Sequence, residues 1–509
     1  IDLTAITTGS KGWKITNSGA AAELTGSALG DTLTGGNDDD TLTGGLGNDS
    51  LVGGGGNDLV SYATATAAVN VNLEAGTASG AAGNDVITSV ERVTGSAFAD
   101  TLQGGTGNDT LTGGLGNDIF NVARGTDTIT DLGNNQDTLT VTAGATAQAT
   151  IVNAWTATAA STNKGTANLS TPGLSVNLSA ITTDLGWGVT NTGPQTTLIG
   201  SALADTLTGG AGDDTLRGGL GNDSLTGAGG ADTFEITSGT DVVTDVGLGN
   251  DVLQVSGGAT VNATVNQAWT ASSGNLNNGT ANLGTAGFGV NLSAITSGAN
   301  GWSVTNSGGA ALIVGSALAD TLIGGTGNDT LRGFTGNDQL TGGGGNDLFL
   351  IDVGADTITD VGAGTDVIQV SAGASVAATV SADWVATASS ENNGTAAITT
   401  SGKAVNLGLV TTGSGWDVTN SGATGTTLTG SGLADTLTGG SGNDTLIGGP
   451  GADSLTGGLG NDTFNVASGT DAITDLSGND VVMVDVGATV NATISNAWTA
   501  TSASYNRGT

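Results

Sequence analysis

A nine-residue pattern recurs along the chain and places an aspartate directly after a glycine-rich turn. It reads glycine, glycine, any residue, glycine, Asn or Asp, Asp, any residue, a large aliphatic residue, any residue. Examples are GGLGNDSLV at 44–52, GGTGNDTLT at 104–112 and GGSGNDTLI at 439–447. Glycine accepts positive φ angles and lets carbonyl oxygens come close together. Carbonyl oxygens and one carboxylate per turn are the donors that a hard cation such as Ca²⁺ prefers.

A single turn of this kind supplies too few oxygens, because Ca²⁺ takes six to eight oxygen ligands at roughly 2.3–2.6 Å. Two turns that stack one strand spacing apart, about 4.8 Å, can share an ion. The residues after each aspartate form a short strand whose aliphatic side chain points inward, while its neighbours point outward. The pattern therefore predicts stacked coils that are joined by cations in their turns.

The aspartate at the sixth position is the candidate metal ligand of each turn. A role in turn formation alone would also allow Asn or Ser there, but the matching motifs carry only Asp. These candidates are Asp31, Asp40, Asp49, Asp58, Asp100, Asp109, Asp118, Asp205, Asp214, Asp223, Asp232, Asp320, Asp329, Asp338, Asp347, Asp435, Asp444, Asp453 and Asp462.

The nonapeptide resembles the calcium-binding repeat of the repeats-in-toxin (RTX, hemolysin-type) family. The resemblance implies an all-β fold of tandem parallel β-roll (β-solenoid) modules with multiple Ca²⁺ ions in the turns. We expect these modules to alternate with short β-strand regions, because Val, Thr and Ile alternate between them. The resemblance also implies type I secretion.

Further aspartates follow each block of nonapeptides and resemble the terminal coils of the same family. Two interpretations remain open for them: additional calcium ligands, or solvated aspartates in turns. They are Asp127, Asp131, Asp137, Asp241, Asp245, Asp251, Asp356, Asp360, Asp366, Asp471, Asp475 and Asp480.

Some motifs depart from the pattern. The first motif of most blocks, such as GSALADTLT at 200–208, lacks the second and fourth glycines, so we expect it to start the roll with an incomplete site. Ala228 and Phe334 replace a second glycine, and Asp38 replaces a fourth. Asp tolerates left-handed backbone geometry better than most residues.

The chain also contains a longer repeat of about 114 residues, and each copy includes several nonapeptides. The phrase VNLSAIT begins at Val176 and again at Val290, with weaker versions at Ile1 and Val405. We expect four repeat units: 1–175, with an extra insert at about 59–118; 176–289; 290–404; and a truncated unit at 405–509.

Two tryptophans belong to each repeat unit, and they have two interpretations. They could bind a partner from the surface, but packing in the core or between units is the more usual role of such a residue. The eight are Trp13, Trp155, Trp187, Trp269, Trp302, Trp384, Trp416 and Trp498.

Composition limits the function. The chain of 509 residues has a net charge of −37 and contains no Cys and no His. The missing His excludes a Ser-His-Asp triad and a His-ligated zinc, and each unit repeats the same acids, so we expect no enzyme. Nucleic acid is excluded as a partner because a basic surface is missing. No apolar run is long enough to enter a membrane as a helix.

Two structural functions remain. The first is a secreted calcium-binding protein of the bacterial cell surface that self-assembles into an S-layer or extracellular filament, as a homo-oligomer or polymer, with cell-surface polysaccharide as a further candidate partner. The acidic, Cys-free, Gly- and Thr-rich composition is closest in character to surface-assembly members of the family. The alternative is the calcium-rigidified extender region of a large secreted adhesin. The absence of linkers between units favours the first.

Overall fold

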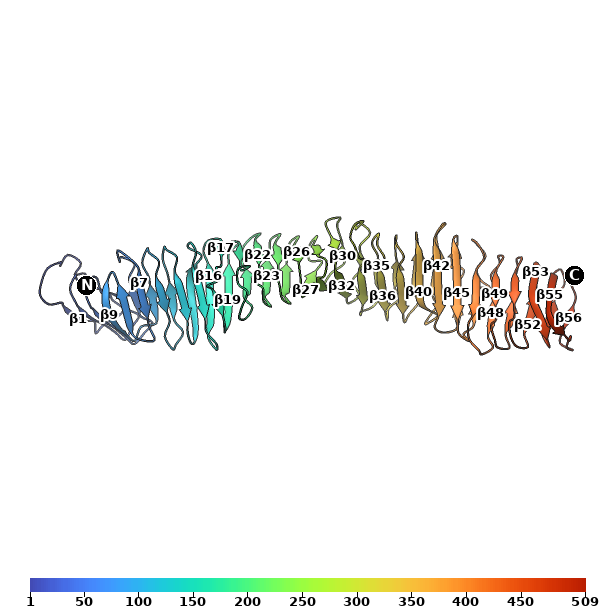
Figure 1. Cartoon of the computed structure of the whole chain (residues 1–509), viewed down its shortest axis with the longest axis horizontal. Coiled ribbons are helices and arrows are strands. Elements are labelled where there is room, and N and C mark those ends of the chain that lie inside the picture. Colours follow the sequence, from blue (N-terminus) through green and yellow to red (C-terminus); the bar gives the residue numbers. More distant parts are fainter. The chain divides into compact units, whose positions relative to one another are not determined.

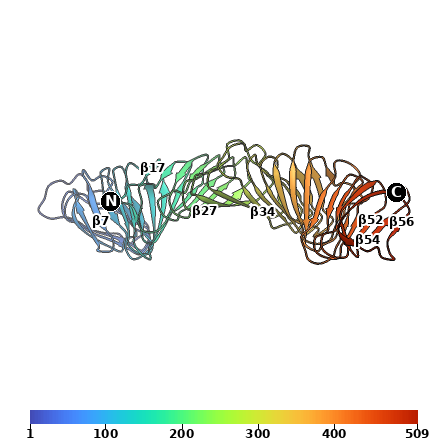
Figure 2. The same cartoon turned by 45° about the vertical axis from the view of Figure 1, so that its right-hand side comes forward.

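The computed structural model describes residues 1–509 and consists of β-strands without a helix. It divides into two compact units, residues 1–261 and 262–509. Within each unit, successive strands lie side by side and wind as a parallel β-solenoid (Figures 1 and 2). No helix is available that is long and apolar enough to cross a membrane. The predicted all-β parallel β-roll fold is confirmed.

Each coil of a roll contains two nonapeptides, and each nonapeptide supplies one short strand. β23 (Thr206–Gly210) pairs in parallel with β25 (Ser224–Ala228), whereas the intervening β24 (Thr215–Arg217) pairs with β26 (Thr233–Ile236). Alternate strands thus build two sheets, and the aliphatic residue of each strand points between them. Leu207, Leu216 and Leu225 are all fully buried in this thin core.

In residues 1–261, one sheet contains β2 (Glu23–Thr25), β4 (Thr41–Thr43), β6 (Leu59–Ser61), β10 (Arg92–Thr94), β12 (Thr110–Thr112), β14 (Thr126–Leu132), β16 (Thr146–Ile151), β19 (Thr166–Thr171), β21 (Gly188–Asn191), β23, β25 and β27 (Thr240–Val246). The other side is formed by β1 (Lys14–Thr16), β3 (Thr32–Gly36), β5 (Ser50–Gly54), β7 (Val69–Asn72), β8 (Thr77–Gly80), β9 (Gly83–Thr88), β11 (Thr101–Gln103), β13 (Ile119–Val122), β15 (Thr138–Val141) and β18 (Thr162–Asn163), and then by β17 (Trp155–Thr156), β20 (Val176–Asn177), β22 (Thr197–Ile199), β24, β26 and β28 (Val252–Val255). β29 (Thr260–Val265) contains the boundary between the two units.

In residues 262–509, the first sheet contains β32 (Thr280–Thr285), β34 (Ser303–Asn306), β36 (Thr321–Gly325), β38 (Gln339–Gly343), β40 (Ala355–Val361), β42 (Ser375–Val380), β45 (Thr395–Thr400), β47 (Asp417–Asn420), β49 (Thr436–Thr438), β51 (Ser454–Thr456), β53 (Thr470–Gly478) and β55 (Thr489–Trp498). The remaining strands are β30 (Trp269–Thr270), β31 (Leu276–Asn277), β33 (Val290–Asn291), β35 (Leu312–Val314), β37 (Thr330–Arg332), β39 (Leu348–Ile351), β41 (Val367–Val370), β43 (Trp384–Val385), β44 (Glu391–Asn392), β46 (Val405–Asn406), β48 (Thr427–Thr429), β50 (Thr445–Ile447), β52 (Thr463–Val466), β54 (Val481–Val484) and β56 (Tyr505–Asn506).

The β-strand regions between the rolls are further coils of the same solenoid. In residues 1–261, β14, β16, β19 and β21 pair in sequence, and Thr146 of β16 lies opposite Thr166 of β19. These coils are slightly longer than the coils of a roll, in which Thr206 lies opposite Ser224. Smaller inward residues, such as the buried Ala147, replace the leucines. Rolls and intervening regions therefore form one continuous stack within each unit.

The insert of the first repeat interrupts this parallel winding. β7, β8 and β9 form an antiparallel meander in which β8 pairs with both neighbours. The meander joins the solenoid at both ends, because β9 pairs in parallel with β5 and β7 pairs in parallel with β11. The insert is thus built into the second sheet, where it replaces a regular strand.

Six of the eight tryptophans are buried, which confirms the packing role for them. Trp155 contacts Trp187 with ring centroids 6.4 Å apart, and Trp384 contacts Trp416 at the same distance. Trp13 differs, since half of its surface is exposed. Each of these two contacts joins a tryptophan near the end of one repeat unit to a tryptophan near the start of the next.

Candidate metal centre

The sixth-position aspartates form ladders along the turns of each roll. In the second repeat, the backbone N–H of Asp205 donates to Oδ1 of Asp223 at 2.9 Å, and the N–H of Asp223 donates to Oδ1 of Asp241 at 3.0 Å. On the other side of the same roll, Asp214 donates to Asp232 at 2.8 Å. A backbone N–H of each coil therefore holds the aspartate of the next coil in register, and this bond uses only the Oδ1 atom of that aspartate.

The second oxygen of many of these carboxylates is buried and has no hydrogen-bond partner. A buried carboxylate oxygen without a protein partner is costly, so a bound cation would suit this position. The aspartates with such an Oδ2 atom are Asp40, Asp49, Asp58, Asp118, Asp127, Asp214, Asp223, Asp241, Asp329, Asp338, Asp444, Asp453 and Asp471. They occur in every roll.

Many of the unpartnered oxygens lie against a glycine, where a side chain would collide with them. A Cβ atom on Gly324 would lie 2.8 Å from Oδ2 of Asp329 and 2.6 Å from the carbonyl oxygen of Gly342, in the next coil of the same side. On Gly209 it would lie 2.7 Å from Oδ2 of Asp214 and 2.8 Å from the carbonyl oxygen of Gly227. Carboxylate and carbonyl oxygens from two successive coils converge there, which is a donor set that suits a hard divalent cation.

Electrostatics in the ladders also favours a cation. Burial, together with the neighbouring carboxylates Asp241 and Asp205, raises the pKa of Asp223 to about 7. Burial and the neighbours Asp320 and Asp356 raise the pKa of Asp338 to about 8. An ion of opposite charge between the carboxylates would remove this mutual repulsion.

Each candidate site of this kind combines a carboxylate oxygen of one coil with a carbonyl oxygen of the next. In keeping with that, no group of three or more His, Cys, Asp or Glu side chains gathers at one point. The candidate cation sites thus lie between stacked pairs of turns.

Eight of the twelve aspartates that follow the rolls have partners for both oxygens, whereas Asp127, Asp241 and Asp471 keep an unpartnered Oδ2. Asp245 accepts the N–H groups of Gly227 and Ala228 at 3.0 and 2.6 Å, and Asp251 accepts those of Asp232 and Gly247 at 3.0 and 2.8 Å. The same arrangement holds at Asp131, Asp137, Asp360, Asp366, Asp475 and Asp480. These eight carboxylates close the end of a roll by binding backbone.

Four further aspartates of the ladders are buried, and the Oδ1 atom of each accepts the backbone N–H of the preceding aspartate in its ladder; they are Asp232, Asp347, Asp356 and Asp462. Asp109 accepts the N–H of Gly105 at 2.5 Å. The first aspartates of the rolls, Asp31, Asp100, Asp205, Asp320 and Asp435, have a different environment, which is described below.

Two acids of the insert extend the ladders and were missed from the sequence. Asp85 accepts the N–H of Asp49 at 2.9 Å, and Glu91 accepts the N–H of Asp58 at 3.0 Å. Neither residue follows a glycine pair, so the nonapeptide pattern does not find them. The sequence GNDVIT around Asp85 retains the second half of the motif and was the available signal.

The residues that replace glycine behave differently from one another. Ala228 and Phe334 keep the left-handed backbone of the glycine that they replace, with φ of 71° and 77°. Asp38 does not adopt positive φ, so the tolerance of Asp for that region is not needed at this turn. Retained geometry at Ala228 and Phe334 preserves the ladders around them.

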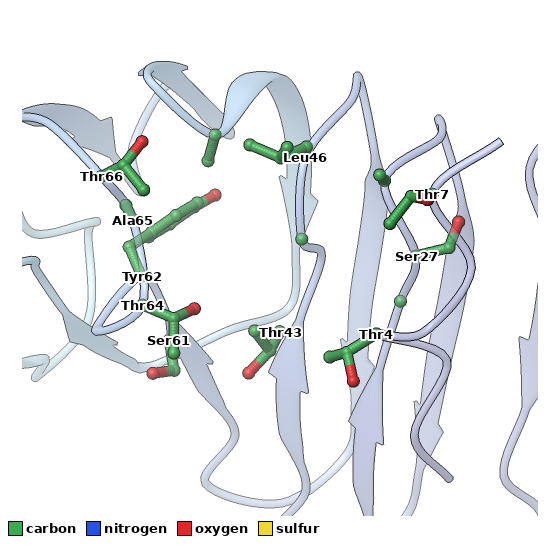
Figure 3. A pocket seen from close by; sticks show the side chains of 14 residues that line it. Thr4, Thr7, Ser27, Thr43, Leu46, Ser61, Tyr62, Thr64, Ala65 and Thr66 are labelled. Carbon is green, nitrogen blue, oxygen red and sulfur yellow. The ribbon is translucent and has the colours of Figure 1, made fainter.

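A separate recess of about 300 Å³ lies between the N-terminal segment and the insert (Figure 3). Thr4, Thr7, Thr43 and Thr64 contribute hydroxyl groups to its wall, and the ring of Tyr62 lies across it. The Tyr62 hydroxyl donates to Asp85 at 2.9 Å, and burial raises its pKa. The lining is neutral, in contrast to the acidic turns.

The raised pKa values predict how the metal-free protein responds to pH. The folded-state pKa of Asp223 and Asp338 lies well above the unfolded value of about 3.9, so the folded chain binds more protons between these values. Stability therefore falls as the pH rises from about 5 through 8. In metal-free buffer, far-ultraviolet circular dichroism should show less β-sheet at pH 8 than at pH 5. A β-sheet signal that rises with pH in the absence of metal would contradict the burial of unpaired carboxylates.

Comparison with known protein families identifies the turns. The model of the RTX calcium-binding nonapeptide repeat (4 copies) matches residues 25–60, 94–129, 199–234, 314–349 and 429–464. No curated protein matches the chain. The matched segments contain the unpartnered carboxylates, except Asp241 and Asp471, which follow directly in their ladders. The chain is therefore an all-β repeat protein that carries RTX calcium-binding nonapeptides, a kind of repeat that is typical of secreted proteins.

Proposed function

We propose that this protein is a secreted structural component of a bacterial cell surface, which calcium folds and which then self-assembles into an S-layer or extracellular filament. The observation that carries the proposal is the ladder of buried, unpartnered carboxylate oxygens in every roll. The same site is repeated along a continuous stack of coils, as expected of a material whose stiffness comes from many equivalent ions.

Charge explains how such a protein could be exported before it folds. With a net charge of −37, the metal-free chain repels itself and favours expanded states at low calcium. Calcium outside the cell would fill the turns, and its binding free energy would then become folding free energy. This coupling serves both an assembling surface protein and an adhesin extender.

Surface features support assembly over a simple extender. Leu46, Leu115, Leu220 and Leu459 project from the turns with exposed fractions of 50, 61, 59 and 75%. Exposed leucines at repeated positions suit contacts between molecules. A polysaccharide of the cell surface is a second partner that we propose, because the recess is neutral and its wall combines the ring of Tyr62 with several threonines.

The test is calcium titration of the chelator-treated chain, followed by light scattering and sedimentation velocity. Assembly predicts that the mean particle mass grows with calcium. The variant with Leu220→Ser and Leu459→Ser is expected to bind the same amount of calcium and to scatter less. A chain that stays monomeric while it becomes compact would reject the lattice or filament and support the extender.

A further inference from the structure

A serine occupies the second position of the first nonapeptide in every roll, where most other nonapeptides carry glycine. Four residues later comes the first aspartate of the ladder. The serines are Ser27, Ser96, Ser201, Ser316 and Ser431, and the matching aspartates are Asp31, Asp100, Asp205, Asp320 and Asp435. All ten are buried.

The serine satisfies the carboxylate that would otherwise face a cation. In the second repeat, the N–H of Ser201 donates to Oδ2 of Asp205 at 2.5 Å, and the Ser201 hydroxyl lies 2.8 Å from the same oxygen and 3.1 Å from Oδ1. The N–H of Trp187 donates to Oδ1 at 2.6 Å. The equivalent contacts recur in the other four rolls.

The orientation of the hydroxyl group is fixed by a further bond. The N–H of Leu203 donates to Oγ of Ser201 at 3.1 Å, so the serine oxygen already accepts a hydrogen bond. Its own proton then points toward Asp205. By contrast, Asp214 and Asp223 in the same roll have a buried Oδ2 atom without any donor.

We infer that the serine hydroxyl takes the place of the cation at the first turn of each roll, so that these five aspartates are held without calcium. This inference rests on the proposed calcium binding by the remaining turns. Each roll would thus start from a coil that is folded before calcium arrives. Because the N–H of Asp205 also holds Asp223 in register, that coil is a template for the first calcium-dependent turn.

Calcium counting on the full chain tests this inference with two matched variants. Asp205→Asn should leave the number of bound Ca²⁺ ions per chain unchanged in equilibrium dialysis, whereas Asp223→Asn should lower it by at least one. Equal losses in the two variants would overturn the inference and leave the proposed function intact. Unchanged counts in both would overturn calcium binding by the ladders, and the inference with it.

Hydrogen exchange on the unmodified chain gives a second test that does not depend on a variant folding. After chelation, amides of the turns around Asp214 and Asp223 should exchange about 1,000-fold faster, the factor expected if calcium had been a thousandfold above its dissociation constant. Amides around Ser201 and Trp187 should change by less than about tenfold. Equal acceleration in both regions would contradict a calcium-independent first coil.

Discussion

Chelation of calcium at pH 8 is expected to unfold the calcium-dependent coils of the rolls and to remove much of the β-sheet signal in far-ultraviolet circular dichroism. One site at a calcium concentration a thousandfold above its dissociation constant contributes about 4 kcal/mol of stability. Three such sites contribute about 12 kcal/mol, which is as much as the whole stability of an ordinary domain. The buried carboxylates, such as Asp338 with its raised pKa, add repulsion once the ions are gone.

The matched control for chelation is sodium chloride at the same ionic strength as the calcium buffer. Simple screening of the charge would be reproduced by sodium, because screening depends on ionic strength. If calcium binds at specific sites, the β-sheet signal should return only when calcium is added back. An unchanged spectrum after complete removal of the metal would show that the turns are stable without it, and the proposed function would fail.

The fold could be predicted from the nonapeptide because its two signals agree. Glycine at the turn and leucine at the eighth position, as in Leu207 and Leu216, each demand a tight coil with one inward side chain. The coils between the rolls were harder to predict. The inward residues of these coils, such as Ala147 and Ala149, are small, and the coils are longer than those of a roll. The sequence therefore predicted separate strands there and not further turns of the stack.

The residues of the candidate site could be predicted from the sequence, but the bonds that distinguish its aspartates could not. The missing glycines of the first motif predict an incomplete site at Asp205 and a complete one at Asp223, but they do not show what holds the Asp205 carboxylate. The difference between the two aspartates comes from Ser201, whose hydroxyl reaches Asp205 only when the turn is folded. Asp85 and Glu91 were missed for the opposite reason: pairing between β9 and β5 and between β10 and β6 brings them to the ladders, and no local motif marks them fully.

Replacement of Gly324 by alanine is expected to abolish calcium binding between the coils of Asp329 and Asp347. The new Cβ would lie 2.8 Å from Oδ2 of Asp329 and 2.6 Å from the carbonyl oxygen of Gly342, so both candidate ligands would have to move. Gly324 does not adopt positive φ, so the strain comes from these contacts and not from the backbone angle. The expected loss is about 4 kcal/mol of calcium-dependent stability, measured by urea unfolding in saturating calcium.

Gly344→Ala is the control in the same roll. Gly344 also lacks positive φ, and a Cβ there would meet no atom within 4 Å. This variant should bind calcium and unfold like the unmodified chain. The difference in stability between the two variants should disappear in chelator, because the calcium-dependent coils are then unfolded in both. If Gly324→Ala binds as much calcium as Gly344→Ala, the ion does not lie between the Asp329 carboxylate and the Gly342 carbonyl, and the paired-turn site is wrong.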